Sequence, residues 1–362
     1  MKKTNKILAI ILAILMATTI IPLAANASET SGKCGASLTW NFDASTYTIT
    51  ISGTGDMYDY EYRGQPWKEF RGYIKNVVIG EGVTSVGENA FASETSLGSV
   101  VLADTIETIG DYAFSHCFAI KSVELPENLI TLGDYAFAYC LISDLTFNDC
   151  LTSVGYAAFI GTNIKTVVLP DTVTSIGGLA FRDCDELETV VLPDSVTSIG
   201  NSLFTNCVAL KSVKLPKNLT IIENNMFEGC SKLESIELPD CITTIGDFAF
   251  KNCTALSEFT FPSALTELGI TVFMGCTSLK EAVIPESITE IPGNMFVESG
   301  ITKVTIHDKV TSIGSGVFYG CVDLKSIELP DSLTEIGTNA FCGSGLESII
   351  IPESVTDRKS VV

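Results

Sequence analysis

Cysteines at a repeated spacing are the feature of this sequence that most resembles a chemical site. Eight of the twelve cysteines follow a phenylalanine by three residues, and we call them the cysteine column: Cys117, Cys140, Cys184, Cys207, Cys230, Cys253, Cys276 and Cys321. In a secreted protein, such a set normally suggests a disulfide framework. No C-x-x-C pair is present to suggest a zinc site.

The other occupants of this column favour packing over bonding. In the remaining units the same position holds Glu94, Thr162, Ser299 and Ser344. The position therefore accepts residues that cannot form a disulfide, and free cysteine packs as a small apolar side chain. We predict buried free thiols, ahead of disulfides or metal ligands. The state of four cysteines outside the column is left open: Cys34, Cys150, Cys241 and Cys342.

The residues needed for acid–base or nucleophilic catalysis do not come together in the sequence. The two histidines, His116 and His307, belong to different repeating units and to different columns, so they support no Ser-His-Asp or Cys-His arrangement. Asp and Glu number 43 against 22 Lys and Arg, and paired carboxylates in so acidic a chain discriminate nothing. We predict that the protein is not an enzyme and needs no cofactor.

Acidic side chains follow the end of the predicted strand in eleven of thirteen repeating units. Five of them form what we call the acidic ridge: Asp104, Glu127, Asp149, Asp171 and Asp194. Coils stacked about 5 Å apart would align these side chains. We favour turn preference and solubility as the explanation, and the alternative is a site for calcium or for a basic partner.

These columns exist because the chain repeats one unit. The unit reads L-x-x-V-x-L-P-[DE]-x-[VL]-T-x-I-G-x-x-A-F-x-x-C, and it begins at residues 74, 97, 120, 142, 164, 187, 210, 233, 256, 279, 301, 324 and 346. Twelve units are complete and the thirteenth is cut short, so residues 74–356 form the repeat region. A period of 22 or 23 residues is typical of a solenoid.

Each unit contains a predicted short strand and one phenylalanine. In 210–216 apolar and polar residues alternate as in a strand, which Pro216 ends. The phenylalanines are Phe91, Phe114, Phe137, Phe159, Phe181, Phe204, Phe227, Phe250, Phe273, Phe296, Phe318 and Phe341. Burying about five apolar side chains per unit contributes roughly 10 kcal/mol, whereas fixing the backbone costs about 1 to 2 kcal/mol per residue. A lone unit cannot fold, and we predict a core of stacked rings.

The predicted strands expose two columns of side chains, which are candidates for binding. We call six of these residues the strand face: Thr166, Thr189 and Ser212 in one column and Val168, Val191 and Lys214 in the other. This surface is flat, mildly apolar and without aromatic side chains. It is more typical of a protein-binding surface than of a sugar site.

A second candidate surface is aromatic. Consecutive early units carry Tyr112, Phe118, Tyr135, Tyr139 and Tyr156, which we call the aromatic cluster. Tyrosine often anchors a binding partner, and the alternative is ordinary packing on the convex side.

The N-terminal segments predict an exported protein with a capped repeat region. A basic start, "MKKTNK", precedes an apolar stretch and a small-x-small site, so residues 1–27 read as a signal peptide. No later stretch is long and apolar enough to predict a membrane span. In residues 28–73, "SLTWNF" and "TYTITISG" alternate as in a hairpin whose apolar side chains would cover the first coil. The net charge of −21 argues against nucleic acid and anionic membranes as partners.

The last six residues, "DRKSVV", depart from the repeat. One reverse translation of residues 357–362 resembles a short-read sequencing adapter. We interpret these residues as a sequencing artefact, and we expect the natural protein to continue, with any C-terminal anchor or docking module beyond this point.

The repeated unit resembles a known family. Units of the form "LxSVxLPDSVTSIGxxAFxxC", preceded by "CGxxLTW" and "TISGTGxM", are similar to the BspA-like leucine-rich repeat proteins of bacterial surfaces. The resemblance covers about Cys34 to Thr356. It implies an exported or surface protein that adheres to host matrix proteins or to other cells, with no family-wide catalytic residue.

We therefore predict a right-handed leucine-rich repeat solenoid. A parallel sheet would form its concave side, short strands or helical turns its convex side, and a β-hairpin its N-terminal cap. The predicted function is non-catalytic binding or adhesion to proteins outside the cell. The alternatives are a structural spacer and a glycan-binding accessory region of a larger surface protein.

Overall fold

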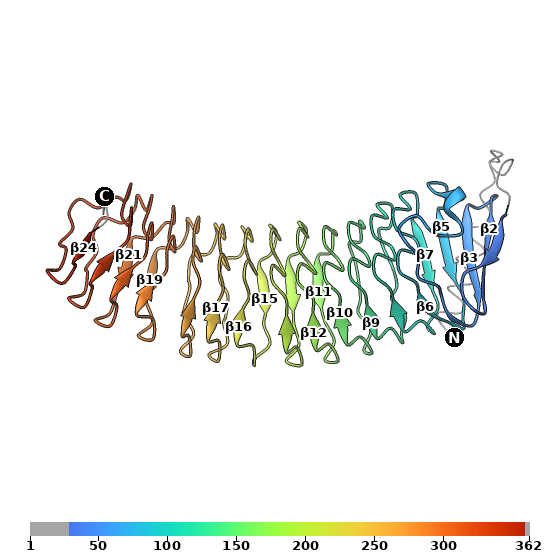
Figure 1. The fold of residues 1–362 in the computed structure, drawn as a ribbon, viewed down its shortest axis with the longest axis horizontal. Helices are drawn as coiled ribbons and strands as arrows, with labels where there is room; N and C mark the ends of the chain where they lie inside the picture. Colours follow the sequence, from blue (N-terminus) through green and yellow to red (C-terminus); the bar gives the residue numbers. More distant parts are fainter. Residues whose placement is uncertain (1–28, 359–362) are drawn as a thin grey trace. The chain divides into compact units, whose positions relative to one another are not determined.

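The computed structural model describes residues 29–358, so the predicted signal peptide and the last four residues of the predicted artefact lie outside the described part. The chain divides into two compact units, one up to Ile164 and the other from Lys165. Each unit is a stack of short coils joined by parallel strand pairs (Figure 1). The predicted repeat solenoid is therefore confirmed within each unit.

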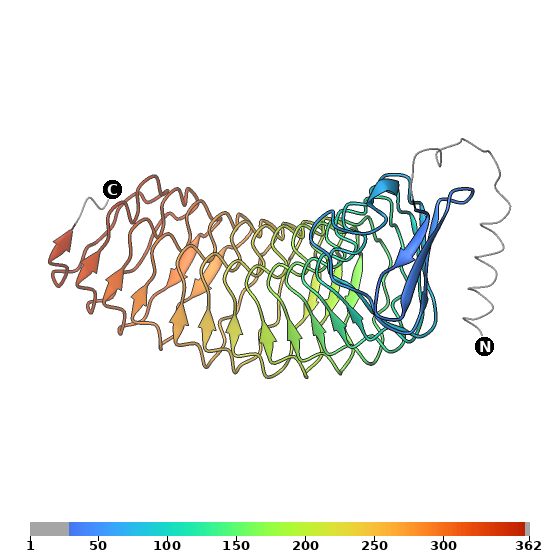
Figure 2. The same ribbon diagram turned by 45° about the vertical axis from the view of Figure 1, so that its right-hand side comes forward.

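Every coil has three sides, as the coil that begins at Leu187 illustrates. The first, the strand side, carries a strand such as β13 (Thr189–Val191). The second, the short side, carries a two-residue strand such as β14 (Ser198–Ile199). The third, the turn side, is a run of turns that contains the ladder phenylalanine. Figure 2 shows the strands of successive coils lying side by side in each unit.

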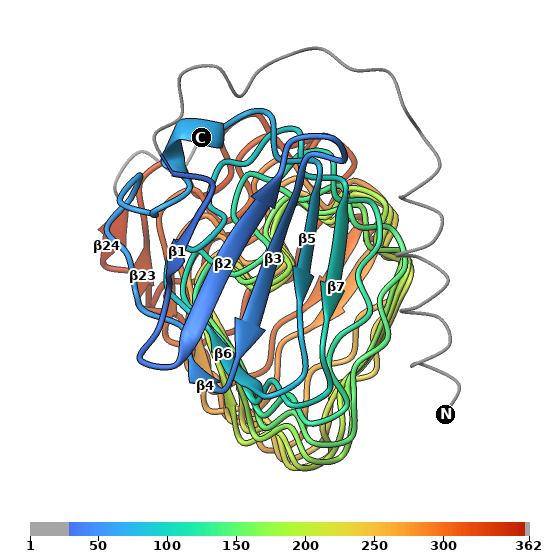
Figure 3. The ribbon, with the colours of Figure 1, turned by 90° about the vertical axis from the view of Figure 1, so that its right-hand side faces the viewer.

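In the first unit, the strand side forms one sheet in the order β1-β2-β3-β5-β7 (Figure 3). Its strands are β1 (Ser31–Lys33), β2 (Leu38–Asp43), β3 (Thr48–Gly53), β5 (Asn76–Ile79) and β7 (Ser99–Leu102). The short side pairs β4 (Gly55–Asp56), β6 (Val83–Val86), β8 (Thr108–Ile109), β9 (Thr131–Leu132) and β10 (Ser153–Val154) in that order. β2 pairs antiparallel with β1 on one side and with β3 on the other, and the other pairs are parallel. The predicted hairpin is thus β2 and β3, and it extends the first sheet.

In the second unit, the strand side is interrupted. It comprises β11 (Thr166–Val168), β13 and β15 (Ser212–Lys214), and then β19 (Glu281–Val283) and β21 (Lys303–Thr305). The short side comprises β12 (Ser175–Ile176) with β14; β16 (Ile221–Ile222), β17 (Thr244–Ile245) and β18 (Glu267–Leu268); and β20 (Glu290–Ile291), β22 (Ser312–Ile313), β23 (Glu335–Ile336) and β24 (Asp357–Arg358). The coils between β15 and β19 have no strand on this side.

The phenylalanine column forms the core of each unit. All twelve rings are at most 2% exposed. In the first unit, the rings from Phe91 to Phe159 stack with centroids 5.2 to 5.9 Å apart. In the second, the rings from Phe181 to Phe341 stack with centroids 5.3 to 6.1 Å apart. Each ring is covered by its neighbours in the stack, which is the basis for expecting that one coil alone cannot complete its core.

Hydrogen bonds between coils also hold the turn side together. The amide N–H of alternate residues donates to the next coil: Asn89 to Asp111 O at 2.9 Å, Phe91 to Ala113 O at 2.8 Å and Ser93 to Ser115 O at 2.7 Å. Asn89 and Ser93 adopt positive φ angles of 55° and 62°. This geometry is not helical, and the one helix within residues 29–358 is the 3-10 helix η1 (Lys68–Phe70). Of the two predicted alternatives, short strands or helical turns, the coils contain short strands together with turns that are not helical.

The N-terminal cap donates hydrogen bonds to the first coil, one from the backbone and two from side chains. The Tyr60 N–H donates to Glu88 O at 3.0 Å, the Trp67 indole Nε1 to Ala90 O at 3.1 Å, and the Arg71 Nη2 to Ala92 O at 3.1 Å. These three carbonyls occupy the positions that accept amide protons from the preceding coil elsewhere in the unit. The Trp67 ring also stacks on Phe91 at 5.1 Å. The cap therefore satisfies buried acceptors whose desolvation would otherwise destabilise the first coil.

Candidate binding surface

The structure brings the six residues of the strand face together. Thr166 pairs with Thr189, which pairs in turn with Ser212, in the parallel register of β11, β13 and β15. In the same register Val168 pairs with Val191, which pairs with Lys214. The side chains between them, such as those of Val167 and Val190, are buried. The six residues are exposed or half-exposed, and Val168 is 55% exposed.

The chemistry of the strand face is that of a contact surface. One row offers hydroxyl groups that both donate and accept hydrogen bonds, and the other offers aliphatic surface ending in the Lys214 ammonium group. Neighbouring side chains within a row repeat at the strand spacing of about 4.8 Å. An extended protein segment with a matching periodicity could contact several coils at once.

The aromatic cluster lies on the turn side of the first unit and contains two groups of contacting rings. Tyr112 and Tyr135 stack at 4.8 Å, and Tyr156 meets Tyr135 edge to face at 5.5 Å. In the second group, Tyr139 packs on His116 at 4.8 Å. His116 was not predicted to be a member of this cluster. His116 occupies the same column as Tyr139 one repeat earlier, two residues after its ladder phenylalanine, and both residues have a φ of 59°, so the column alignment carried the signal.

Stacking limits what the aromatic cluster can bind. The facing sides of the Tyr112 and Tyr135 rings cover each other, so these two ring faces are not open to a partner. A neighbouring groove of about 440 Å³ is lined by Tyr62, Asn89, Ala92, Ser93, Tyr112, Ser115 and His116. The Tyr62 and Ser93 hydroxyl groups are hydrogen-bonded at 3.2 Å. Burial lowers the pKa of His116, which favours its neutral form in this groove.

Two residues of the acidic ridge accept hydrogen bonds from the next coil. Asp104 Oδ1 accepts the Glu127 N–H of the next coil at 3.0 Å. Asp194 Oδ1 accepts the Lys217 N–H at 3.0 Å, and its other oxygen pairs with the Lys217 ammonium group at 2.8 Å. Hydrogen bonds from Lys217 lower the pKa of Asp194. The residues of the ridge are exposed or half-exposed, with Asp104, Glu127 and Asp149 in the first unit and Asp171 and Asp194 in the second.

A second series of side chains that cap the next coil was not predicted. Asp111 Oδ1 accepts the Asp134 N–H at 2.7 Å, and Asp134 Oδ1 accepts the Tyr156 N–H at 2.7 Å. Asn224 and Asp247 do the same in the second unit. The signal was the recurrence of Asp or Asn after the glycine of the repeat. Many carboxylates of this acidic chain therefore bind the protein's own amides.

Within residues 29–358, no three His, Cys, Asp or Glu side chains gather in a group that could hold a metal ion. In the same part of the chain, no helix is long and apolar enough to cross a membrane. Whether calcium binds to the acidic ridge stays a prediction to be tested.

The cysteine column is buried and free, as predicted. Seven of its thiols donate to the carbonyl of the ladder phenylalanine in the preceding coil, at 2.9 to 3.2 Å; they belong to Cys117, Cys140, Cys207, Cys230, Cys253, Cys276 and Cys321. Burial raises the pKa of Cys140 and of Cys276 to about 12. These thiols are therefore protonated and unreactive at neutral pH.

The remaining cysteines and the second histidine also have structural surroundings. All four cysteines outside the column are free: Cys34 is buried, Cys241 and Cys342 are half-buried, and Cys150 is exposed. The His307 Nε2 contacts Pro285 O at 2.8 Å, and its Nδ1 accepts the Lys309 N–H at 3.1 Å. His116 and His307 lie in different compact units; His116 Nδ1 contacts Ser115 of its own turn at 2.8 Å, whereas His307 contacts both its own turn and the preceding coil.

Comparisons with known proteins agree with this architecture. A leucine-rich repeat protein from Bacteroides ovatus is 29% identical, with a TM-score of 0.71, over 89% of this chain and 88% of its own. Leucine-rich repeat proteins from Eubacterium ventriosum and Faecalibacterium prausnitzii, the latter described as a cell surface protein, are each 24% identical. Their TM-scores are 0.55, over 90% of this chain and 97% of theirs, and 0.50, over 93% and 96%. At this identity they show the fold alone.

The repeats themselves match a family description. The BspA type leucine rich repeat region, a model of six copies, matches residues 69–188, 174–301 and 289–361. A comparison with curated proteins found no match. Because these matches cover most of the sequence, the chain belongs to the BspA type leucine-rich repeat family.

Proposed function

We propose that the protein is an exported, non-catalytic binding protein that presents its coils to proteins of the host matrix or of other cells. The observation that supports this most directly is the strand face. Its two rows run in register across β11, β13 and β15, with Val168 and Lys214 exposed. Residues held on three hydrogen-bonded strands form a rigid surface, so little conformational entropy is lost when a partner binds.

The location and the family add support to the proposal. The basic and apolar start of the sequence is typical of export. Membership of the BspA type family and the description of the Faecalibacterium relative as a cell surface protein agree with a place outside the cell. Non-catalytic action fits the burial of the cysteine column and the structural engagement of both histidines.

A binding survey with the purified chain tests the proposal. Immobilised extracellular-matrix proteins and a glycan array would be probed with the same labelled protein at physiological salt. We expect saturable binding to at least one matrix protein and none to the glycans. Glycan binding alone would favour the accessory region, and no binding on either surface would favour the spacer. Either result would overturn the proposed function.

A further inference from the structure

The strand face carries hydroxyl groups that the protein itself does not use. Within residues 29–358, no side-chain hydrogen bond forms at the three residues of this hydroxyl row, Thr166, Thr189 and Ser212. Hydroxyl groups near the short side differ. That of Thr197 donates to Thr174 O of the preceding coil at 3.3 Å. That of Thr243 donates to Thr220 O at 3.2 Å. The protein thus uses those hydroxyl groups to join its coils, whereas the hydroxyl row is available to a partner.

Lys214 is the one charged residue of the strand face, and among the described residues its ammonium group forms no ion pair. The two other lysines of the same coil are paired. Lys211 Nζ lies 2.8 Å from Glu188 Oε2. Lys217 Nζ lies 2.8 Å from Asp194 Oδ2, and Lys214 acts on Asp194 only from beyond ion-pair distance. The charges beside Lys214 are therefore neutralised within the protein, and its own charge is not.

A groove of about 690 Å³ lies beside Lys214 on the strand side of the second unit. Ser212 and Lys214 line it from the strand face, and Glu237 lines it from the next coil. Glu237 occupies the column of Lys214 one repeat later, and in the described part of the chain the two side chains form no ion pair. Along this column the surface thus changes from the apolar Val191 to a cation and then to an anion.

A partner that covers the strand face must satisfy these polar groups. Burial of a hydroxyl group without a hydrogen bond, or of an ammonium group without a counter-charge, disfavours binding. The hydroxyl row can donate to backbone carbonyls, and Lys214 calls for a carboxylate. Backbone carbonyls are free in an extended segment that belongs to neither a helix nor a sheet, such as a polyproline II segment.

We propose that the strand face binds an extended segment of a partner protein that carries a carboxylate beside apolar residues. The carboxylate pairs with Lys214, and the apolar side chains lie on Val168 and Val191. The backbone carbonyls of the segment accept hydrogen bonds from the hydroxyl row. The proposal rests on the proposed function and specifies the chemistry of the partner at the same surface.

The spacing of the strands fits such a segment. Val168 and Lys214 lie two strands apart, which is about 9.6 Å at the usual strand spacing. A polyproline II segment has three residues per turn and rises about 3.1 Å per residue, so every third side chain returns to the same side after about 9.3 Å. A carboxylate three residues from an apolar residue therefore reaches Lys214 while the apolar residue covers Val168.

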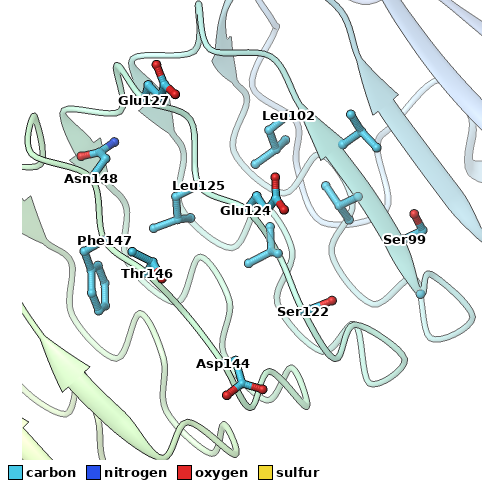
Figure 4. Close-up of a pocket in the computed structure, with 14 residues that line it drawn as sticks. Ser99, Leu102, Ser122, Glu124, Leu125, Glu127, Asp144, Thr146, Phe147 and Asn148 are labelled. Carbon is cyan, nitrogen blue, oxygen red and sulfur yellow. The ribbon is translucent and has the colours of Figure 1, made fainter. Parts of the chain in front are cut away.

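The first unit presents the opposite charge on its strand side. A groove of about 620 Å³ there has carboxylates from Glu124, Glu127 and Asp144, and no lysine or arginine is among its lining residues. Figure 4 shows Glu124 between the other two carboxylates. Glu124 occupies the column of Lys214 in its own coil. An acidic segment is repelled by this groove, so charge directs it to the strand face of the second unit.

Synthetic peptides test the inference in a double-mutant cycle. The probes are the fluorescein-labelled peptide Pro-Pro-Pro-Glu-Pro-Pro-Pro and the same peptide with glutamine in place of glutamate. Fluorescence anisotropy measures their binding to the purified chain. The wild type should bind the glutamate peptide about 3-fold more tightly than the glutamine peptide. Lys214→Gln should remove this preference, because the cycle isolates the interaction between the carboxylate and the ammonium group.

Two further variants control for total charge. Lys303→Gln removes the same charge from β21, which lies outside the strand face, and it should keep the preference of the wild type. Glu237→Gln removes a repulsive neighbour of the bound carboxylate, so it should increase the preference by about 2-fold. Melting curves confirm that all three variants fold.

Several outcomes would overturn the inference. They are equal binding of both peptides to the wild type, no binding of either, and a preference that survives in Lys214→Gln. Tighter binding of a peptide with lysine in place of glutamate would indicate a basic partner instead. Heparin binding that Lys214→Gln abolishes would assign this lysine to a sulfated glycan, which also contradicts the inference. If the wild type still binds a matrix protein in the survey, the proposed function stands while this partner chemistry fails.

Discussion

Replacing Phe227 with alanine removes one ring from the middle of the phenylalanine column in the second unit. The ring is fully buried, and its centroid lies 5.7 Å from that of Phe204 and 5.4 Å from that of Phe250. Truncation of a buried phenylalanine costs about 3 to 5 kcal/mol. Stacking with the two neighbours accounts for about 0.5 to 1.5 kcal/mol per contact. We expect the free energy of unfolding to fall by about 3 to 5 kcal/mol.

Urea denaturation at constant temperature, followed by circular dichroism, measures this loss. Phe118→Ala is the control, because Phe118 is 46% exposed and stands outside the column. Its truncation should change the free energy of unfolding by no more than about 0.5 kcal/mol. A loss below about 1 kcal/mol for Phe227→Ala, or one equal to that of the control, would contradict the stacked core.

Three further predictions concern thiols, a buried carboxyl group and calcium. A thiol reagent at mildly alkaline pH should modify the exposed Cys150 in the native protein but leave the cysteine column unmodified until denaturant is added. The reason is burial, which raises the pKa of Cys140, for example, to about 12. Rapid modification of all twelve cysteines in the native protein would disprove this. Burial also raises the pKa of Glu94 above 4.5, so the native state binds this proton more tightly than the unfolded state does. The melting temperature of the wild type, relative to Glu94→Gln, should therefore fall as the pH rises from 4.5 toward neutrality, and parallel pH profiles would refute the argument. Millimolar calcium should leave the melting temperature unchanged, because Asp104 and Asp194 already accept backbone amides; a rise of several degrees would reveal an ion site.

Much of the fold follows from the repeat because each column has one physical task. Phenylalanine at a fixed offset in every unit predicts a buried stack, and alternation around Val167 and Val190 predicts strands with one face inward. Once the period is known, the register of Thr166, Thr189 and Ser212 also follows. The strand face could therefore be assembled from the sequence, although its binding stays a prediction.

Other features depend on geometry that the repeat does not encode. The donors of the N-terminal cap, Trp67 and Arg71, lie outside the repeat, and their targets are carbonyls that only the folded coil exposes. The turn side requires positive φ angles at residues such as Tyr112 and Tyr139, which have no glycine to signal them. The end of the first sheet after β7 is not signalled by a single column either, because the position of Glu124 in the next coil is occupied by Lys214 in strand β15 and by Thr260 in a coil without a strand.

We propose that the protein binds its partner through the strand face, and a matched pair of variants tests this binding most directly. Val168 on β11 and Val283 on β19 occupy the same column and are 55% and 64% exposed. Each is replaced by aspartate, and surface plasmon resonance measures affinity for a matrix protein identified in the survey. We predict that Val168→Asp weakens binding about 10-fold, which corresponds to about 1.4 kcal/mol, while Val283→Asp binds like the wild type. Equal affinity of all three proteins would contradict the claim.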